Sequence, residues 1–469
     1  MLRILLRRAS ATIPIVVRVH PQITLLSSPM PPQLNIPLSH FSFLLDPKRL
    51  AKKDAKVKKK EKRALKRGKP GTNPEDLEEE GVRSAVSSDD ESILSVDPIP
   101  ETYSSTIDVG PSGLPLFTNH RSISSLTRKD VNSYIDFSLE DLDEKLPEGL
   151  PDGMIKEFKE TKRCALLVRK SFLDLRDNFR RIIDPTLFSS TKISKARRQI
   201  VLDGPVSCGK SVALAMLVHW ARTEGWLVFY VPKAKEWTHG GSFSRNPDTN
   251  LFDTPSQATQ ILQDFLKYNT ACLQKLQCQI SDPIPLGSEN TESIAKGGLM
   301  ALPKNATLFD LINSGVNYRQ ASVGVVVRLR EELSLVKDIP VLFAIDQYNS
   351  WFTFSEYKEQ VTVHSRKQVH AKYLATVNAY RSMLHENMMV GAFSHSTAVG
   401  KLRQDLPDVP LDSRMQFPRY SLDEAAVVCH YYLRQKLIRS ESFSEAKWKR
   451  IYYVANGNGS EIRWLVPFI

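Results

Sequence analysis

Short apolar runs and longer segments with helical periodicity alternate through the second half of the chain. Four continuous apolar runs predict strands buried on both faces, at 199–203, 226–231, 341–345 and 388–393. Helices are predicted at 154–179, 212–222, 256–276 and 326–336, the last from the three, four, three spacing of Val326, Leu329, Leu333 and Val336. This alternation predicts an α/β fold with a parallel sheet flanked by helices.

The sequence of residues 416–469 no longer alternates between strands and helices and predicts a group of short helices. The tetrapeptide Ser421-Leu422-Asp423-Glu424 is a capping box, which opens the first of these helices. A second helix is predicted at 444–455, and a third begins at Ser460. We therefore divide the folded part of the chain into an α/β domain at 131–415 and a C-terminal helical lid at 416–469.

The composition of the first 130 residues predicts no folded domain. Residues 1–45 contain no Asp or Glu and carry Arg3, Arg7, Arg8 and Arg18. The first nineteen residues are basic and amphipathic, and this composition is typical of a mitochondrial or plastid transit peptide. The alternative is an uncleaved disordered end. Residues 46–130 hold a basic run and then an acidic stretch, and they predict a disordered charged tail.

The basic run at 48–69 is the main source of the chain's positive charge. It contains thirteen Lys or Arg residues against Asp54 and Glu61, within a formal net charge of +12 for all 469 residues. A run of this kind stays solvated and binds polyanions such as RNA. A solubilising linker and a nuclear-localisation patch are the alternative interpretations.

A glycine-rich segment directly after the first predicted strand carries the clearest candidate chemistry. It fits the pattern G-x-x-x-x-G-K-[ST] of phosphate-binding loops, and we assign nucleotide binding to Gly204, Pro205, Val206, Ser207, Cys208, Gly209, Lys210, Ser211 and Val212. Backbone N–H groups would surround the β-phosphate, Lys210 would reach the β- and γ-oxygens, and the Ser211 hydroxyl would ligate Mg²⁺. Strand, loop and helix follow one another in the order that this pattern requires.

A second half of the site is predicted at the end of the strand over 341–345. Asp346 can hold the Mg²⁺ shell opposite Ser211, although an Asp in this position can also simply cap a turn. The next residue is Gln347, where active ATPases of the AAA+ type carry a second acid. Gln347 can position a water molecule but cannot take its proton, so we expect slow hydrolysis or none. Ser394, His395 and Arg463 are candidate sensors of the nucleotide; a turn residue and a surface arginine are the alternatives.

Composition excludes several other classes of protein. The five cysteines show no C-x-x-C spacing, so the sequence predicts neither a zinc site nor a disulfide framework. No apolar run after the N-terminus is long enough to predict a membrane span.

The order of these segments resembles one protein family, the mitochondrial small-subunit ribosomal proteins of the death-associated protein 3 type. The resemblance covers roughly residues 145–469 and rests on 202–211, His219-Trp220, 226–237, 308–315, 344–351 and 456–458. Its most specific part is Asp346-Gln347-Tyr348-Asn349-Ser350-Trp351, where Asp, Asn and an aromatic residue stand in the family's order.

The resemblance implies a P-loop, AAA+-like fold with bound guanine nucleotide, GTP or GDP, and Mg²⁺. It implies a structural place in the small mitochondrial ribosomal subunit, with contacts to its rRNA, to neighbouring ribosomal proteins and to the large subunit. The residues alone leave ATP possible as the nucleotide. They also leave open an AAA+ or signalling ATPase that remodels a partner complex, and a nuclear nucleic-acid-binding regulator.

The N-terminal composition leads to a direct prediction. A fluorescent protein that carries residues 1–45 should enter mitochondria, because arginines without acids follow the membrane potential. Replacing Arg3, Arg7 and Arg8 with Glu should abolish import, as measured by microscopy and fractionation. Nuclear accumulation of the unaltered fusion would contradict the prediction.

Overall fold

The computed structural model describes residues 108–184, 196–287, 298–382, 389–393 and 409–468. The predicted transit peptide and the basic run at 48–69 lie outside these residues, as do the candidate sensors Ser394 and His395. Residues 108–130 belong to the folded part, since Leu116, Ile123 and Leu126 are all buried. The folded part therefore begins before the predicted boundary at 131.

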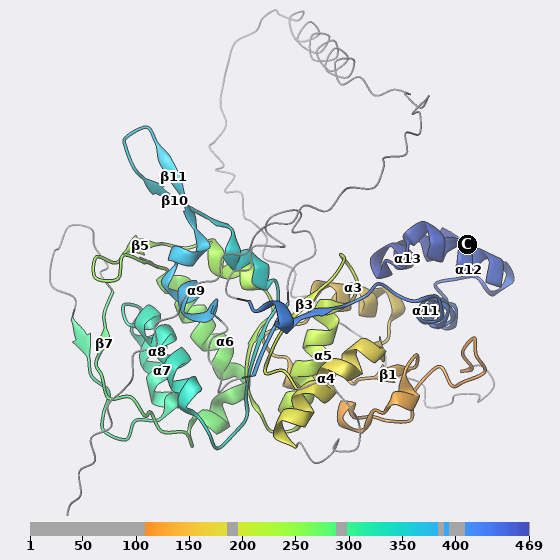
Figure 1. Ribbon diagram of the computed structural model, residues 1–469, viewed down its shortest axis with the longest axis horizontal. Coiled ribbons are helices and arrows are strands. Elements are labelled where there is room, and N and C mark those ends of the chain that lie inside the picture. The colour runs from red at the N-terminus through yellow and green to blue at the C-terminus, as the bar shows by residue number, and fades with distance from the viewer. Residues whose placement is uncertain (1–107, 185–195, 288–297, 383–388, 394–408, 469) are drawn as a thin grey trace, which may run out of the picture. The chain divides into compact units, whose positions relative to one another are not determined.

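A five-stranded sheet in which every neighbouring pair is parallel lies at the centre of the α/β part (Figure 1). Its order is β13–β3–β12–β9–β4, and its strands are β3 (Gln199–Asp203), β4 (Leu227–Val231), β9 (Val341–Ile345), β12 (Met389–Phe393) and β13 (Arg414–Gln416). The four predicted strands are confirmed. The edge strand β13 was not predicted, because Arg414-Met415-Gln416 forms no apolar run.

Helices cover both faces of the sheet, which explains the uninterrupted apolar runs of the strands. On one face, Phe229 and Phe343 pack against α6 (Pro255–Leu273), α7 (Leu308–Asn317), α8 (Ser322–Leu335) and α9 (Ala375–Tyr380). On the other face, Val228 and Leu342 pack against α2 (Leu139–Lys145), α3 (Asp152–Thr161), α4 (Lys170–Ile183) and α5 (Lys210–Thr223). Successive residues of one strand point to opposite faces, so both sets must be apolar.

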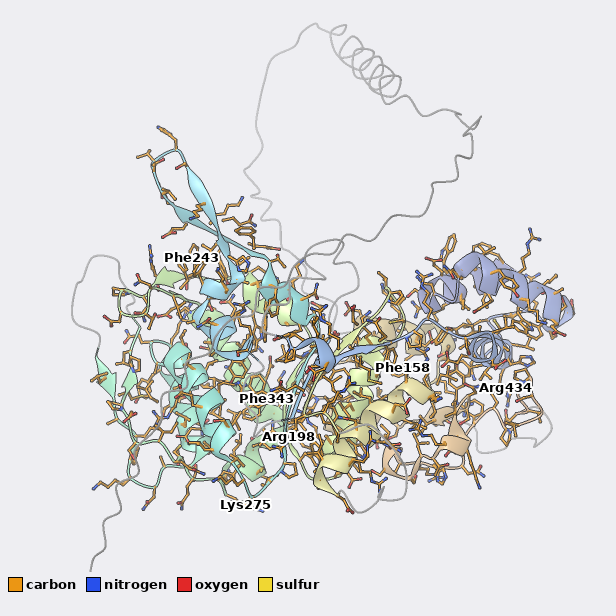
Figure 2. The ribbon with its side chains drawn as sticks, in the orientation of Figure 1. Phe158, Arg198, Phe243, Lys275, Phe343 and Arg434 are labelled. Atoms are coloured by element: carbon orange, nitrogen blue, oxygen red, sulfur yellow. The ribbon has the colours of Figure 1, made fainter. Side chains whose placement is uncertain are left out.

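Aromatic side chains fill much of the first face. The ring of Phe343 lies 5.5 Å from that of Phe229 and 5.9 Å from that of Tyr380, measured between centroids. The guanidinium of Arg330 lies 4.5 Å from the Phe343 centroid. Phe158 of α3 belongs to the core on the opposite face (Figure 2).

The single helix predicted at 154–179 is wrong, because a strand interrupts it. Helix α3 ends at Thr161, and Lys162 takes a left-handed conformation with φ of 52°. Strand β2 (Ala165–Leu167) then pairs in antiparallel fashion with β1 (Tyr134–Asp136) before α4 begins. The run from Cys164 to Val168 is buried throughout, so its apolar side chains match a short strand as well as a helix.

The C-terminal helices α11 (Leu422–Arg434), α12 (Glu445–Ala455) and α13 (Gly459–Leu465) form a core of their own with the paired strands β1 and β2. Tyr431 of α11 stacks on Tyr134 of β1, with ring centroids 3.9 Å apart. The predicted capping box of α11 is confirmed by reciprocal hydrogen bonds between Ser421 and Glu424.

The remaining strands form short hairpins: β5 (Ser244–Arg245) with β6 (Phe252–Asp253), β7 (Ile284–Pro285) with β8 (Leu299–Met300), and β10 (Phe354–Gln360) with β11 (Arg366–His370). The β10–β11 hairpin projects from the body of the protein in Figure 1. Among the described residues, no helix is long and apolar enough to cross a membrane.

The packing of α7 against α6 and α8 requires a glycine. A Cβ atom at Gly315 would lie 2.5 Å from Leu262 Cδ1 and 2.8 Å from Val325 Cβ. We expect Gly315→Ala to destabilise the protein by about 1–3 kcal/mol, because the three helices must move apart. Chemical denaturation measures the change. Gly153→Ala in α3 is the matched control, since no atom lies within 4 Å of its Cβ position; an equal loss in both variants would contradict the packing argument.

Candidate functional site

The glycine-rich loop after β3 adopts a conformation that its two glycines make possible. Gly204 has a φ of 157° and Gly209 a φ of 87°, while Ser207 between them has a φ of 56°. A Cβ atom at Gly204 would lie 2.3 Å from the carbonyl oxygen of Phe417, which follows β13. Larger residues are therefore excluded at the first position by the backbone of the neighbouring strand segment.

Lys210 is folded back onto this loop. Its side chain is buried, and its Nζ donates to the carbonyl oxygens of Gly204 at 2.9 Å and Pro205 at 2.8 Å. The thiol of Cys208, also buried, lies 3.5 Å from the same Nζ. Burial lowers the pKa of Lys210, because it removes the ammonium from water. Phosphate oxygens could replace these carbonyls as partners of the ammonium.

The two predicted metal ligands come together at the end of the loop. Asp346 follows β9 directly, is buried, and accepts hydrogen bonds from the Ser211 hydroxyl and, at 2.8 Å, from the Gln347 N–H. Burial raises the pKa of Asp346 to about 6, although both hydrogen bonds and the charge of Lys210 oppose this shift. A divalent cation beside the carboxylate would favour its charged form.

These oxygens suit Mg²⁺ in type but are too few to hold it alone. Mg²⁺ takes about six oxygen ligands and commonly shares one or two carboxylates with substrate phosphates and water. Among the described residues, no group of three or more His, Cys, Asp or Glu side chains is placed to hold a metal. Ser211 and Asp346 would therefore need phosphate and water oxygens to complete a magnesium shell.

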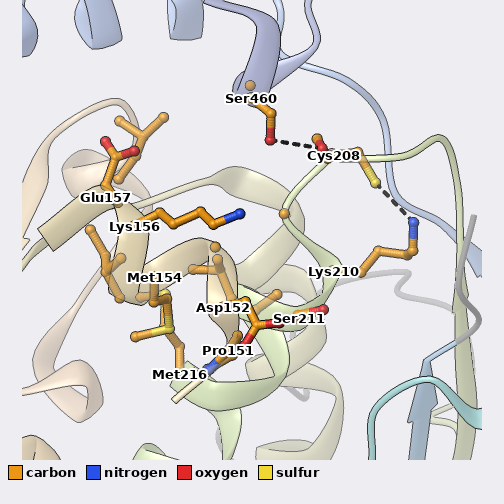
Figure 3. Close-up of a pocket in the computed structure, with 18 of the residues that line it drawn as sticks. Pro151, Asp152, Met154, Lys156, Glu157, Cys208, Lys210, Ser211, Met216 and Ser460 are labelled. Atoms are coloured by element: carbon orange, nitrogen blue, oxygen red, sulfur yellow. Dashed lines mark hydrogen bonds between the residues drawn. The ribbon is translucent and has the colours of Figure 1, made fainter. Parts of the chain in front are cut away.

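A cavity of about 490 Å³ opens beside the loop, which is the size of a small-molecule site (Figure 3). Helix α3 forms one wall, from Asp152 to Glu157, and α13 contributes Gly459, Ser460 and Arg463. Residues 206–213 line the cavity, together with Asp346 and Gln347. Gln347 has a left-handed backbone conformation with φ of 58°. The structure thus brings most of the predicted site residues to one hollow. Gly204 and Pro205 do not line it, although their carbonyl oxygens accept hydrogen bonds from Lys210.

The C-terminal helices touch the loop directly. The hydroxyl groups of Ser460 and Ser207 lie 2.9 Å apart, and the Gly459 N–H donates to the Ser207 carbonyl oxygen at 3.3 Å. Arg463 lines the cavity, but its guanidinium pairs with Glu157 and Glu160 of α3, each at 3.1 Å. Its predicted role as a sensor would require it to exchange one of these partners.

Arg169 is a central residue that the sequence did not reveal. It is buried, and its guanidinium makes two hydrogen bonds to the Glu424 carboxylate, at 2.8 and 2.9 Å. It also donates to the carbonyl oxygen of Cys208 at 2.6 Å and to those of Pro418 and Arg419 at 3.1 and 3.2 Å. No local pattern marks an arginine after a short strand as a residue that binds three distant segments.

Comparison with known proteins assigns this chain to a family. The model of the family described as "Mitochondrial ribosomal death-associated protein 3" matches residues 166–405, and the chain belongs to this family. A curated relative is "Small ribosomal subunit protein mS29" of Bos taurus, which is 22% identical over 360 residues, covering 72% of this chain and 84% of the relative. The predicted family resemblance and the mitochondrial location are thereby confirmed.

The raised pKa of Asp346 predicts a pH-dependent stability of the metal-free protein. Between the ordinary Asp pKa of 3.8 and about 6, the folded state binds more protons than the unfolded state, so stability falls as pH rises. Asp346→Asn removes this loss, which amounts to about 3 kcal/mol above pH 6. We expect the variant to melt at a higher temperature than the unaltered protein at pH 7.5 in EDTA, and at a similar temperature near pH 4.

Asp310 provides a control of opposite sign. Hydrogen bonds from the Thr307 backbone and side chain lower the pKa of Asp310. The charged carboxylate therefore stabilises the folded state at neutral pH, and this stabilisation is lost as the solution is acidified. Asp310→Asn should therefore lower the melting temperature at pH 7.5. A pH-independent difference between Asp346→Asn and the unaltered protein would contradict the burial argument.

Proposed function

We propose that this protein is a structural component of the small subunit of the mitochondrial ribosome and that it binds a guanine nucleotide with Mg²⁺ in the cavity beside the glycine-rich loop. Family membership and the name of the bovine relative support the ribosomal part. The meeting of Ser211 and Asp346 at the end of the loop is the observation that carries the nucleotide part. The choice of guanine over adenine rests on the family resemblance.

Sheet order and loop position favour a P-loop, AAA+-like fold with the C-terminal helices as its lid. The loop joins β3 to α5, and β12 separates β3 from β9, which carries Asp346 at its end. All five strands are parallel, so Asp203 before the loop and Asp346 end at the same edge of the sheet. The contacts of Gly459 and Ser460 with Ser207 support a lid role for α13.

Nucleotide entry would exchange the partners of Lys210. Its two carbonyl acceptors are neutral, whereas β- and γ-phosphate oxygens are charged and form stronger hydrogen bonds with an ammonium. Backbone N–H groups of the loop and the positive end of α5 would face the phosphates. When bound, Mg²⁺ would neutralise phosphate charge, with Ser211 and Asp346 as its protein ligands.

The same site is poorly equipped for rapid hydrolysis. Gln347 stands next to Asp346 and lines the cavity, and an amide cannot accept the proton of an attacking water at neutral pH. This favours a nucleotide that stabilises the fold over one that is turned over, and it disfavours the alternative of an ATPase that remodels a partner. A bound ligand stabilises the folded state by about 4 kcal/mol at a thousandfold excess over its Kd.

Small-subunit rRNA, neighbouring ribosomal proteins and bridging contacts to the large subunit are the proposed partners. The basic run at 48–69 suits rRNA phosphates, whose contacts weaken steeply as salt concentration rises. Its thirteen basic residues would thus anchor the protein to RNA, while the folded part holds the nucleotide.

Lys210→Ala tests both parts of the proposal. The substitution removes the charge that would meet the phosphates, so the purified variant should carry at least tenfold less nucleotide, measured by extraction and chromatography. Without its ligand the protein should melt at a lower temperature, and less of it should sediment with small ribosomal subunits in gradients of mitochondrial extract.

Deletion of 48–69 is the complementary variant. It should flatten the salt dependence of subunit binding and leave bound nucleotide unchanged, because the run contains none of the proposed nucleotide or metal ligands. Undiminished nucleotide in Lys210→Ala would refute the site. Unaltered protein found only in complexes without rRNA at low salt would refute the ribosomal assignment.

A further inference from the structure

An ion pair stands at the end of the cavity where Ser211 and Asp346 meet. The Nζ of Lys233 lies 3.3 Å from Oδ1 of Asp152, and both side chains line the cavity. Asp152 opens helix α3, and Lys233 follows strand β4. Neither residue belongs to the glycine-rich pattern or to the segment around Asp346.

Backbone hydrogen bonds place Lys233 next to Asp346, and the side chain of Lys233 forms an ion pair with Asp152. Strands β4 and β9 pair up to Val231 and Ile345. Beyond this pair, the Asp346 N–H donates to the Val231 carbonyl oxygen at 2.8 Å, and the Ala234 N–H donates to the Asp346 carbonyl oxygen at 3.2 Å. Lys233 thus lies between Val231 and Ala234, whose backbones both form hydrogen bonds with the backbone of Asp346.

Figure 3 shows where two acidic side chains of α3 lie in the cavity. Asp152 lies toward Ser211, and Glu157 lies farther along α3, toward the end that Ser460 closes. Burial is the main cause of the raised pKa of Asp346, and the negative charge of Asp152 adds to it. The two carboxylates line one cavity, and the charge of Asp152 disfavours the charged form of Asp346.

The exposure of the pair makes it easy to rearrange. The Asp152 side chain is 68% exposed and that of Lys233 is 42% exposed, so the pair contributes about 0–1 kcal/mol. Mg²⁺ dehydrates reluctantly and keeps several waters, which are hydrogen-bond donors to nearby carboxylates. A solvated carboxylate that lines the same cavity as Asp346 suits a position beside metal-bound water, from which it would accept hydrogen bonds.

We propose that Asp152 is a second carboxylate of the magnesium site, acting on metal-bound water, and that Lys233 holds it in place before metal and nucleotide enter. This inference rests on the proposed nucleotide binding. The second carboxylate thus comes from the N-terminus of α3, and its role is to retain the metal. Through water, Asp152 strengthens the retention of Mg²⁺ and thereby of the metal–nucleotide complex.

The test compares nucleotide affinity with and without metal. Full-length protein is titrated with GDP carrying a fluorescent N-methylanthraniloyl group, first in EDTA and then at increasing Mg²⁺ concentrations. Asp152→Asn should raise the Mg²⁺ concentration for half-maximal binding by about three- to tenfold. In EDTA its affinity for the bare nucleotide should be equal to or tighter than that of the unaltered protein, because a charge that repels phosphate is gone. The Mg²⁺ concentration for half-maximal binding to Asp152→Glu should lie between those of the unaltered protein and Asp152→Asn.

Asp423→Asn is the matched control. Asp423 also lies exposed in the first turn of a helix, α11, so the variant reproduces the loss of a carboxylate near a helix N-terminus away from the cavity. Equal melting temperatures of Asp152→Asn and Asp423→Asn would show that both are folded. Asp346→Asn should weaken the Mg²⁺ dependence further than Asp152→Asn.

The possible outcomes separate this inference from the proposed function. If the unaltered protein binds in a Mg²⁺-dependent manner and Asp152→Asn behaves like Asp423→Asn, the role of Asp152 is refuted and nucleotide binding stands. An equal loss of affinity in EDTA and in Mg²⁺ would likewise refute it. If neither the unaltered protein nor Lys210→Ala binds the probe, the nucleotide site itself fails, and the inference fails with it.

Discussion

The buried guanidinium of Arg169 joins the three segments that surround the cavity: the glycine-rich loop, the chain leaving β13 and the first C-terminal helix. It does so through Cys208, through Pro418 and Arg419, and through Glu424. Arginine can serve all of these acceptors at once because its donors are fixed in one plane. A buried charge of this kind is stable only while its partners are complete; removing one costs about 3–5 kcal/mol.

This arrangement couples the loop to the C-terminal helices. Glu424 serves both as the capping residue of α11 and as the counter-ion of Arg169, so the start of that helix is tied to the carbonyl oxygen of Cys208. On the other side of the loop, Ser207 contacts Gly459 and Ser460. A ligand that rearranges residues 204–209 would therefore act on both ends of the C-terminal helices. This is the behaviour expected of a nucleotide that stabilises a structural protein.

The electrostatics of the cavity also favour the binding of charged ligands. Burial lowers the pKa of Lys210 and raises that of Asp346, so the metal-free site disfavours the charge on both groups. A phosphate beside Lys210 would favour its charged form, and a cation beside Asp346 would favour the charged form of that carboxylate. The proposed binding of a phosphate and a divalent cation would thus supply the charges that these two groups lack in the protein alone.

Local patterns in the sequence determined the elements that depend on local physics. Apolar runs predicted β3, β4, β9 and β12 because both faces of a parallel sheet are covered, and the spacing of Gly204, Gly209, Lys210 and Ser211 predicted the loop. A run of five buried residues at 164–168 misled the prediction of one long helix, since a short apolar segment satisfies either periodicity.

Only the tertiary structure decided which distant residues meet. Asp346 reaches Ser211 because parallel strands end at one edge, an inference that the sequence permits once the sheet is known. Arg169 with Glu424, and Asp152 with Lys233, are pairs separated widely along the chain, and neither carries a local signal. A charge has no periodicity of its own, so its partner is set by the packing of helices and strands around it.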